Sequence, residues 1–245
     1  MARTITDSAE AASELSRRFS HAHRAVFFGG AGVSTASGIP DFRSADGLYH
    51  QHFSHEPEEM LGHDFFMTHT AEFYDFYRER MIAPDARPNR AHEKLAELED
   101  QGHLAAVVTQ NIDGLHQMAG SKHVLELHGS VHRNICQECG ATYSAAWVLA
   151  HEGVPHCDAC GGLVKPDVVL YGEQLDEQVL LASVRAISEA DLMVVGGTSL
   201  VVYPAAGLLG YFGGSELVVV NRDPTPADGR ADLVCACDIA QAFDF

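Results

Sequence analysis

The chain has 245 residues, of which 46% are hydrophobic and 20% are charged, and its formal net charge is −18 at pH 7. This length fits one large domain, or one domain with a small insert, better than two equal domains. Acidic residues number 34 against 16 basic ones, which argues against general DNA or RNA binding because phosphate contacts need clustered Lys and Arg. The acidity suits a basic partner, such as a lysine-bearing peptide, and equally serves solubility.

Membrane and secretory signals are not found in the sequence. No apolar run approaches the roughly 18 to 20 residues that span a bilayer, and residues 1–7 lack the apolar core of a signal peptide. Four of the six cysteines form two Cys-X-X-Cys pairs, which is typical of metal binding in a reducing compartment. We therefore expect a cytoplasmic protein, with no membrane partner and with a monomer as the default.

The first part of the chain alternates apolar runs with helical patterns. Residues 6–19 combine helix formers with apolar residues four apart and predict an N-terminal helix. An apolar strand at 25–28 leads into a glycine-rich loop, after which residues 34–38 predict a short helix that faces bound phosphates. Residues 55–82 are dense in aromatic side chains at helical spacing, and most of these rings are expected in a core.

The remainder of the chain continues the alternation. Asn89 is placed to cap a helix to about residue 100, and residues 176–188 predict another helix. Four more apolar strands are predicted, at 104–108, 124–127, 192–195 and 217–220. Strands that alternate with helices predict an α/β fold with a Rossmann-type parallel sheet and helices on both faces.

Polar or glycine residues follow the predicted strands directly. In parallel sheets, ligands bind beyond the carboxyl ends of the strands. The fold should therefore gather five residues along one edge: Gly30, Asn111, His128, Thr198 and Asn221.

The paired cysteines predict a metal site. Cys136 and Cys139 form one pair, and Cys157 and Cys160 form the other, with residues 140–156 between them. This spacing is typical of a zinc ribbon, and four thiolates leave no open position for water, so the predicted Zn²⁺ is structural. A redox dithiol is the alternative, but it does not account for the paired spacing. We expect the ribbon to be an insert in a small domain.

The glycine-rich loop, residues 29–44, reads GGAGVSTASGIPDFRS. Gly30 and Gly32 allow backbone N–H groups to approach a phosphate without a side chain between them. However, Thr35 replaces the third glycine of a dinucleotide fingerprint, and no acid is placed at a second strand about 20 residues on. This weakens the case for a hydride-transfer dehydrogenase. The acid, ring and cation of residues 41–43 indicate that a reactive group is held beside the phosphates.

Several motifs, taken in order, resemble the catalytic core of the sirtuin family of NAD-dependent protein deacylases, of bacterial type. They are GAGVSTASGIPDFRS, TQNIDGLH, LHG, the two Cys-X-X-Cys pairs, GTSL and VNRD, and they cover nearly the whole chain. The resemblance implies that NAD is a co-substrate and that the chain is a protein-lysine deacetylase. The acyl-lysine oxygen would attack the nicotinamide-bearing ribose carbon, nicotinamide would leave, and the acyl group would then move to ADP-ribose.

The resemblance also implies catalytic roles. His128 would be the general base that activates a ribose hydroxyl, since imidazole titrates near neutral pH. Asn111 and Gln110 would position the ribose, while Asp113 and Ile112 would hold the nicotinamide carboxamide. We therefore predict His128, Asn111 and Asp113 as catalytic residues.

The residues expected to contact NAD lie in the loops that follow the strands. Phe42 would cover the nicotinamide side and exclude water, and Arg43 would neutralise phosphate. Plain turn chemistry could explain any one of these residues, but not all of them. The full set is Gly30, Ala31, Gly32, Thr35, Asp41, Phe42, Arg43, Gln110, Asn111, Ile112, Asp113, His128, Gly197, Thr198, Ser199, Asn221, Arg222, Asp223, Cys237 and Asp238.

An acyl-lysine peptide would add a strand between two exposed segments, 169–173 and 199–203. Backbone pairing reads little sequence, so peptide specificity should be loose. The predicted peptide contacts are Val169, Tyr171, Gly172, Glu173, Leu200 and Val201.

The acyl preference follows from a departure from the family pattern. Sirtuins that favour acidic acyl chains carry Tyr-X-X-Arg, whereas here Tyr74 is followed at that position by Tyr77, and Arg78 comes one residue late. One residue turns a helical side chain by about 100°, so Arg78 should point away from the acyl tunnel. Acetyl-lysine should be a better substrate than succinyl-lysine.

We expect the NAD-binding domain to comprise residues 1–45, 85–130 and 165–245. Residues 46–84 should form the helical part of the small domain and residues 131–164 its zinc-ribbon part, with the active site in the cleft between the domains. Two alternatives are an NAD-dependent mono-ADP-ribosyltransferase, in which another nucleophile captures the ribose, and a non-catalytic NAD-sensing module.

Overall fold

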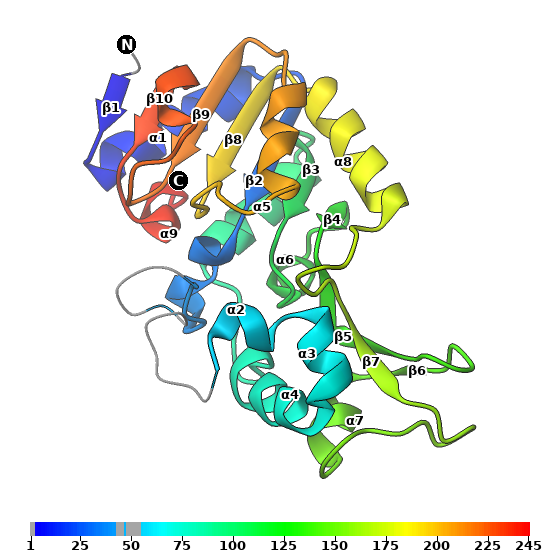
Figure 1. The fold of residues 1–245 in the computed structure, drawn as a ribbon. Helices are drawn as coiled ribbons and strands as arrows, with labels where there is room; N and C mark the ends of the chain where they lie inside the picture. Colours follow the sequence, from blue (N-terminus) through cyan, green and yellow to red (C-terminus); the bar gives the residue numbers. More distant parts are fainter. Residues whose placement is uncertain (1–2, 43–46, 48–54) are drawn as a thin grey trace.

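The computed structural model describes residues 3–42, 47 and 55–245 (Figure 1). Its large sheet has seven strands, all paired in parallel, in the order β1-β10-β9-β8-β2-β3-β4. The strands are β1 (Arg3–Ile5), β2 (Ala25–Gly29), β3 (Leu104–Thr109), β4 (Val124–Glu126), β8 (Leu192–Gly196), β9 (Glu216–Val220) and β10 (Leu233–Cys235). The prediction of a Rossmann-type parallel sheet is therefore confirmed. No helix in the described ranges is long and apolar enough to cross a bilayer.

The central strands are apolar because helices cover the sheet on both faces. Every residue of β2 and β8 is buried, as expected for parallel strands between two layers. Successive side chains point to opposite faces, so Phe27 lies in one apolar cluster while Val26 and Phe28 lie in the other. The sheet therefore has two separate cores.

Different helices contribute to the two cores. The first cluster contains buried residues of α1 (Ser8–His21), α5 (Arg90–Asp100) and α9 (Ile239–Ala242). The second contains residues of α8 (Glu177–Ser188) and the 3₁₀ helix η5 (Ala205–Tyr211). Asp7, Asn89 and Asp176 each cap a helix by accepting a backbone N–H. The predicted helices therefore begin at or close to the expected residues.

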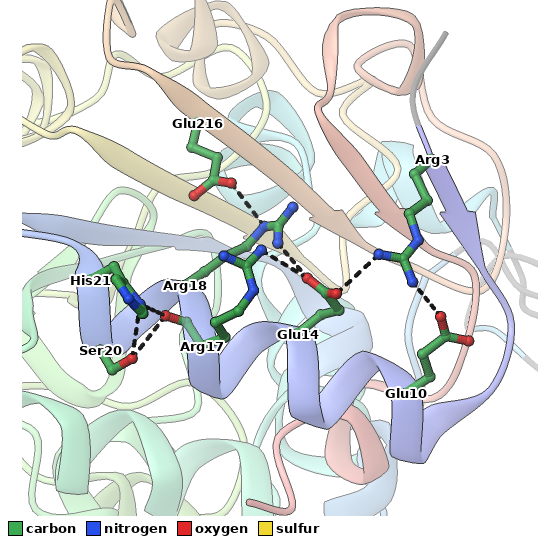
Figure 2. Close-up of polar contacts among 8 residues, drawn as sticks. All are labelled: Arg3, Glu10, Glu14, Arg17, Arg18, Ser20, His21 and Glu216. Atoms are coloured by element: carbon green, nitrogen blue, oxygen red, sulfur yellow. Dashed lines mark hydrogen bonds and ion pairs between the residues drawn. The ribbon is translucent and has the colours of Figure 1, made fainter.

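An ion-pair network attaches α1 to the sheet (Figure 2). Arg18 lies 2.6 Å from Glu14 and 3.1 Å from Glu216 of β9, and only 9% of its side chain is exposed. Arg3 of β1 contacts Glu10 at 2.5 Å and Glu14 at 2.9 Å, but its side chain is 56% exposed. Solvent screens exposed pairs, so Arg18 contributes more than Arg3 to the position of α1.

The small domain lies below the large sheet in Figure 1. Its three-stranded sheet has the order β6-β5-β7, with antiparallel pairing. The elements are β5 (Gly129–Cys136), β6 (Thr142–Tyr143), β7 (Val164–Val168), α2 (Pro57–Met60), α3 (His63–Thr68), α4 (Thr70–Phe76) and α7 (Ala145–Ala150). Phe66, Phe73, Tyr74 and Tyr77 are buried in its apolar core, as predicted for the aromatic helices.

Three details differ from the sequence predictions. Residues 34–38 do not form one helix, because the loop forms two 3₁₀ turns, η1 (Ala31–Val33) and η2 (Thr35–Ser37), and ends at Gly38 with φ 83°. The outer strands β1 and β10 are additional to the five predicted strands. Finally, β7 pairs with β5 rather than with the large sheet, so we propose that the small domain extends to residue 168.

Three shorter elements complete the description. These are α6 (Leu115–Ala119), the π-turn η4 (Tyr77–Met81), which continues α4, and the 3₁₀ turn η6 (Asp228–Arg230).

Candidate active site

A cavity of about 340 Å³ lies where the carboxyl ends of the large-sheet strands meet the small domain. All five residues expected to meet at this edge line the cavity, namely Gly30, Asn111, His128, Thr198 and Asn221. They follow β2, β3, β4, β8 and β9 respectively. The parallel topology therefore brings together residues that are far apart in the sequence.

The glycines of the first loop are required by close packing against a second loop. The N–H of Gly32 donates to the Gly197 carbonyl at 2.8 Å. A Cβ at Gly32 would lie 2.8 Å from the Gly197 Cα, and a Cβ at Gly30 would lie 2.8 Å from the Thr198 Cβ. Gly197 has φ 59°, and a Cβ there would lie 2.4 Å from the Val33 nitrogen. The glycine motif thus serves loop contact as well as any approach to phosphate.

His128 is half-buried, and its tautomer is determined by its neighbour. Its Nδ1 lies 3.0 Å from the Gln110 carbonyl oxygen, and because a carbonyl only accepts, Nδ1 carries the hydrogen. This leaves Nε2 unprotonated in the neutral ring. Burial lowers the pKa of His128, while the hydrogen bond to Gln110 opposes the shift. The imidazole is therefore a neutral base at pH 7.

Asn111 and Asp113 are joined by a serine that the sequence pattern does not single out. The Ser34 hydroxyl donates to the Asp113 carboxylate at 2.6 Å and accepts from the Asn111 amide at 3.1 Å. The second carboxylate oxygen of Asp113 accepts the N–H of Leu115 at 2.9 Å, at the start of α6. A serine in a glycine-rich loop usually indicates only a turn. Its place in this loop is therefore the one sequence feature that could have indicated Ser34 as a site residue.

Two buried histidines lie behind this group. The Nε2 of His92 lies 3.5 Å from the Ser34 hydroxyl, and the His92 ring lies 4.7 Å from the ring of His116. Burial lowers the pKa of His92 to about 4, although the Asp113 carboxylate opposes the shift. Burial also lowers the pKa of His116, and His92 adds to that shift. Both rings are therefore neutral at pH 7.

Most of the other residues predicted to contact NAD line the same cavity. They are Ala31, Gly32, Asp41, Phe42, Gln110, Ile112, Asp113, Gly197, Ser199 and Asp223. Arg43 lies outside the residues that the structure describes.

Four residues of the predicted NAD set do not line the cavity. The Thr35 hydroxyl donates to the Gly32 carbonyl at 3.0 Å, and Cys237 is buried in the first apolar cluster. Arg222 donates to the Asp238 carboxylate at 2.6 Å, and this carboxylate also caps α9. These four side chains therefore support the loops around the cavity rather than form its wall.

Both predicted peptide segments, 169–173 and 199–203, contribute residues to the lining of the cavity. Val169, Tyr171, Gly172 and Glu173 line it, whereas Leu200 and Val201 do not. The Leu200 side chain is buried in the second apolar cluster, with φ 55°. Only its backbone is therefore available to a peptide, because the side chain faces the core.

Glu173 has a supporting role in the peptide segment. Its carboxylate accepts from Lys165 Nζ at 3.0 Å and from the Leu170 N–H at 2.8 Å, and it lies 2.9 Å from His63 Nδ1. In the same segment, the N–H of Tyr171 donates to the Leu61 carbonyl at 2.9 Å. These contacts attach segment 169–173 to the helical part of the small domain.

Several cavity-lining residues were not singled out as site residues from the sequence. They include Ile39, Pro40, Leu61, Arg80, Met81, Val168, Leu175, Pro204 and Pro224. Apolar residues predominate among them. Their positions follow from tertiary packing, which apolar patterns alone do not specify.

Arg78 points into the small domain, as its sequence position predicts. Its Nε donates to the Val148 carbonyl at 3.1 Å, and its guanidinium also donates to the Gly153 carbonyl. The Tyr74 hydroxyl donates to the Val164 carbonyl. Neither side chain lines the cavity, whereas Arg80 of the π-turn does, beside its ion-pair partner Glu79 at 2.9 Å.

The four paired cysteines form a centre that fits Zn²⁺. Their sulfurs all lie within 4.8 Å of one another, with 3.4 Å between Cys136 and Cys160 and 3.6 Å between Cys139 and Cys157. Zn–S bonds of about 2.3 Å place tetrahedral sulfurs about 3.8 Å apart. The Tyr143 hydroxyl donates to the Cys157 sulfur at 3.1 Å. The donor set and its spacing therefore suit one structural zinc ion.

Comparison with known proteins identifies the family. The Sir2 family model matches residues 30–204. The NAD-dependent protein deacetylase of Clostridium acetobutylicum is 56% identical over 235 residues, covering 95% of this chain and 96% of the relative. That of Cutibacterium acnes is 57% identical over 211 residues, covering 85% of this chain and 86% of the relative.

Solved structures agree with these relatives. A complex described as Sir2, p53 peptide and NAD⁺ has a TM-score of 0.83 and 42% identity and covers 94% of each chain. A Sir2 structure bound to an acetylated peptide has a TM-score of 0.83 and 40% identity, again with 94% of each chain covered. With its parallel sheet, four-cysteine centre and strand-end cavity, this chain belongs to the Sir2, or sirtuin, family.

Proposed function

We propose that the chain is an NAD-dependent protein-lysine deacetylase that cleaves NAD to nicotinamide and transfers the acetyl group from lysine to ADP-ribose. The main support for this proposal is the position of His128. It is a neutral base in a cavity that is also lined by Asn111, Asp113 and segment 169–173. Three curated relatives at 54% to 57% identity are named NAD-dependent protein deacetylase, and the matches cover 86% to 96% of those relatives.

His128 acts as the proton acceptor at a ribose hydroxyl of NAD. The Gln110 carbonyl holds Nδ1–H, so the lone pair of Nε2 is the only basic position on the ring. A neutral general base with a lowered pKa needs no prior deprotonation at pH 7. The backbone also fixes this residue, because its carbonyl accepts the N–H of Val169 at 3.0 Å.

Asp113 and Asn111 bind the nicotinamide carboxamide and the adjacent ribose. Ser34 holds both side chains in place, since its single hydroxyl donates to one and accepts from the other. A carboxylate fixed in this way is a strong acceptor for the two N–H groups of a carboxamide. We therefore add Ser34 to the proposed nicotinamide site.

Apolar side chains keep water from the reacting carbon. Phe42 and Ile112 line the cavity and pack against the core of the small domain, and Val168 and Leu170 extend the same wall. Exclusion of water favours acyl transfer over hydrolysis of NAD.

Zinc and the peptide segment complete the proposal. Cys136, Cys139, Cys157 and Cys160 would hold Zn²⁺ as a cross-link of the ribbon, with no open position for catalysis. None of the six cysteines forms a disulfide, as is usual in a reducing compartment, which supports a cytoplasmic location. Acetyl-lysine proteins are the proposed partners of a monomeric enzyme, and the charge of −18 favours basic sequences over nucleic acid.

An assay with NAD and an acetyl-lysine peptide tests the proposal. We expect one nicotinamide released for each peptide deacetylated, and His128→Ala should lower the rate of both by about 10² to 10⁴-fold. Transfer of label from NAD to protein, without deacetylation of the peptide, would instead indicate the mono-ADP-ribosyltransferase. An unchanged rate in His128→Ala would refute the role of the base.

A further inference from the structure

The cap of helix α5 also holds the NAD-binding loop. Asn89 is the N-cap residue, and its side-chain oxygen accepts the N–H of Ala91 at 3.0 Å. The nitrogen of the same amide donates to the Val33 carbonyl at 2.8 Å and to the Ser37 hydroxyl at 2.9 Å. One side chain therefore uses its acceptor for the helix and its donors for the loop.

His92 extends this contact. The N–H of Asn89 donates to His92 Nδ1 at 3.3 Å, which completes the capping box of α5. Nδ1 is thereby the acceptor, so the neutral ring carries its hydrogen on Nε2, which faces the Ser34 hydroxyl at 3.5 Å. The capping box thus reaches the loop at residues 33, 34 and 37.

The loop has little regular structure of its own. The turns η1 and η2 have three residues each, and 3₁₀ turns of this length are weak in isolation. The loop is attached by the hydrogen bond from Gly32 to Gly197, by the bonds of the Ser34 hydroxyl and by Asn89. The direction of its backbone N–H groups therefore depends on several attachments, of which Asn89 supplies the contacts at residues 33 and 37.

We propose that Asn89 is a positioning residue for NAD, which holds residues 31–38 in the arrangement that receives the cofactor. This inference rests on the proposed function only in taking this loop as the NAD site. Asn89 does not line the cavity, so we expect it to act on NAD through the loop and not by direct contact. Its loss should therefore weaken binding of the nucleotide and leave the peptide site unchanged.

Two substitutions separate the cap from the loop contact. Asn89→Asp and Asn89→Ser both keep an oxygen that can cap α5. The carboxylate has no hydrogen to donate to Val33, and the serine hydroxyl is on a shorter side chain, so it does not reach Val33 from the capping position. The first also adds a negative charge and the second does not, so an effect shared by both does not arise from charge. We expect the dissociation constant of ADP-ribose, measured by calorimetry, to rise about tenfold in both variants.

A third variant and a separate readout complete the test. Ser37→Ala removes one of the two acceptors without changing α5 and should raise the same dissociation constant about two- to threefold. Hydrogen exchange at the backbone amides of residues 34–39 should become faster in the unliganded Asn89→Ser protein. The KM for NAD should rise, with the KM for peptide and the melting temperature close to wild type.

The inference and the proposed function can fail separately. If both Asn89 variants bind ADP-ribose with the wild-type dissociation constant, the positioning role is refuted whatever the enzyme does. An equal rise in the KM for NAD and the KM for peptide, together with a lower melting temperature, would also refute it and indicate a purely structural role. A wild-type chain that binds ADP-ribose but deacetylates nothing would refute only the proposed function.

Discussion

The two sheets of the molecule are stabilised in different ways. The large sheet lies between two apolar clusters, and every residue of β2 and β8 is buried. At the ribbon end of the small sheet, the buried members of the apolar cluster among the described residues are Cys136, Cys157 and Val164. A core of this size cannot offset the conformational entropy of the ribbon, so a metal cross-link is needed there. Apolar burial alone thus maintains the large-sheet side of the cavity, whereas the small-domain side depends on its aromatic core and on the metal at the ribbon end.

The largest expected effect is loss of the metal. Cys157→Ala removes a buried ligand, so we expect loss of zinc, local unfolding of the ribbon and a fall in deacetylation of at least about a hundredfold. The control is Cys235→Ala, which removes a buried thiol from the large sheet and should cost only about 1 kcal/mol. Zinc content, circular dichroism and the rate of nicotinamide release are the measurements. Full activity of a zinc-free protein would contradict the comparison.

The second effect concerns pH and the large-sheet side. His92 is fully buried, with a pKa lowered to about 4, so the unfolded chain binds more protons than the native protein between pH 4 and 6.5. Above pH 6.5 the ring is neutral in both states, so its pKa shift does not affect stability there. As the pH falls from 6.5 to 4, protonation of the unfolded chain alone lowers the free energy of unfolding by about 3 kcal/mol. The free energy of unfolding, measured by urea denaturation between pH 4 and 6.5, should therefore depend less steeply on pH in His92→Gln than in the wild type. Equal slopes in the two proteins would contradict the assignment.

A third test concerns the arginines of the small domain. Arg78 donates to the Val148 and Gly153 carbonyls and does not face the cavity. Position 77, where sirtuins that favour acidic acyl chains carry an arginine, is a tyrosine in this chain. Acetyl-lysine peptides should have a kcat/KM at least about tenfold above succinyl-lysine peptides, because a buried, unpaired carboxylate is costly. Comparable values, or succinyl activity that disappears in Arg80→Ala, would overturn this expectation.

The smallest effect concerns the surroundings of the zinc ligands. The Tyr143 hydroxyl accepts the Asp158 N–H at 2.9 Å and donates to the Cys157 sulfur at 3.1 Å. Tyr143→Phe should release zinc to a chelator several-fold to tenfold faster, since a hydrogen bond to a ligand strengthens metal binding. Tyr211→Phe, at an exposed position, is the matched control. Identical release rates in the two variants would show that the hydroxyl does not matter.

The sequence predicts the large sheet well because its physical signals are local. Strands β2, β3, β8 and β9 are continuous apolar runs, as buried parallel strands usually are. The sequence does not predict β1, which has three residues with only Ile5 buried and depends on pairing with β10. The helix expected at residues 34–38 is replaced by 3₁₀ turns, because contact with Gly197 and Asn89 shapes the loop.

The sequence also predicts only part of the candidate site. The ends of the predicted strands indicate which residues meet at the cavity, and the cysteine spacing predicts the metal centre. Both predictions depend on short, local sequence patterns. The partners of these residues are not predictable in this way. His92 reaches Ser34 across 58 residues of sequence, and the burial of Leu200 and Cys237 depends on the helices that cover them.

The wall around the reacting carbon belongs to the small domain as much as to the large one. Phe42 and Ile112 line the cavity, yet both pack against the aromatic core that contains Phe66 and Tyr74. If the small domain rotates, this wall moves with it, and we then expect domain opening to expose the cavity to solvent. The fraction of NAD that is hydrolysed without acyl transfer should therefore measure how tightly the two domains are held together.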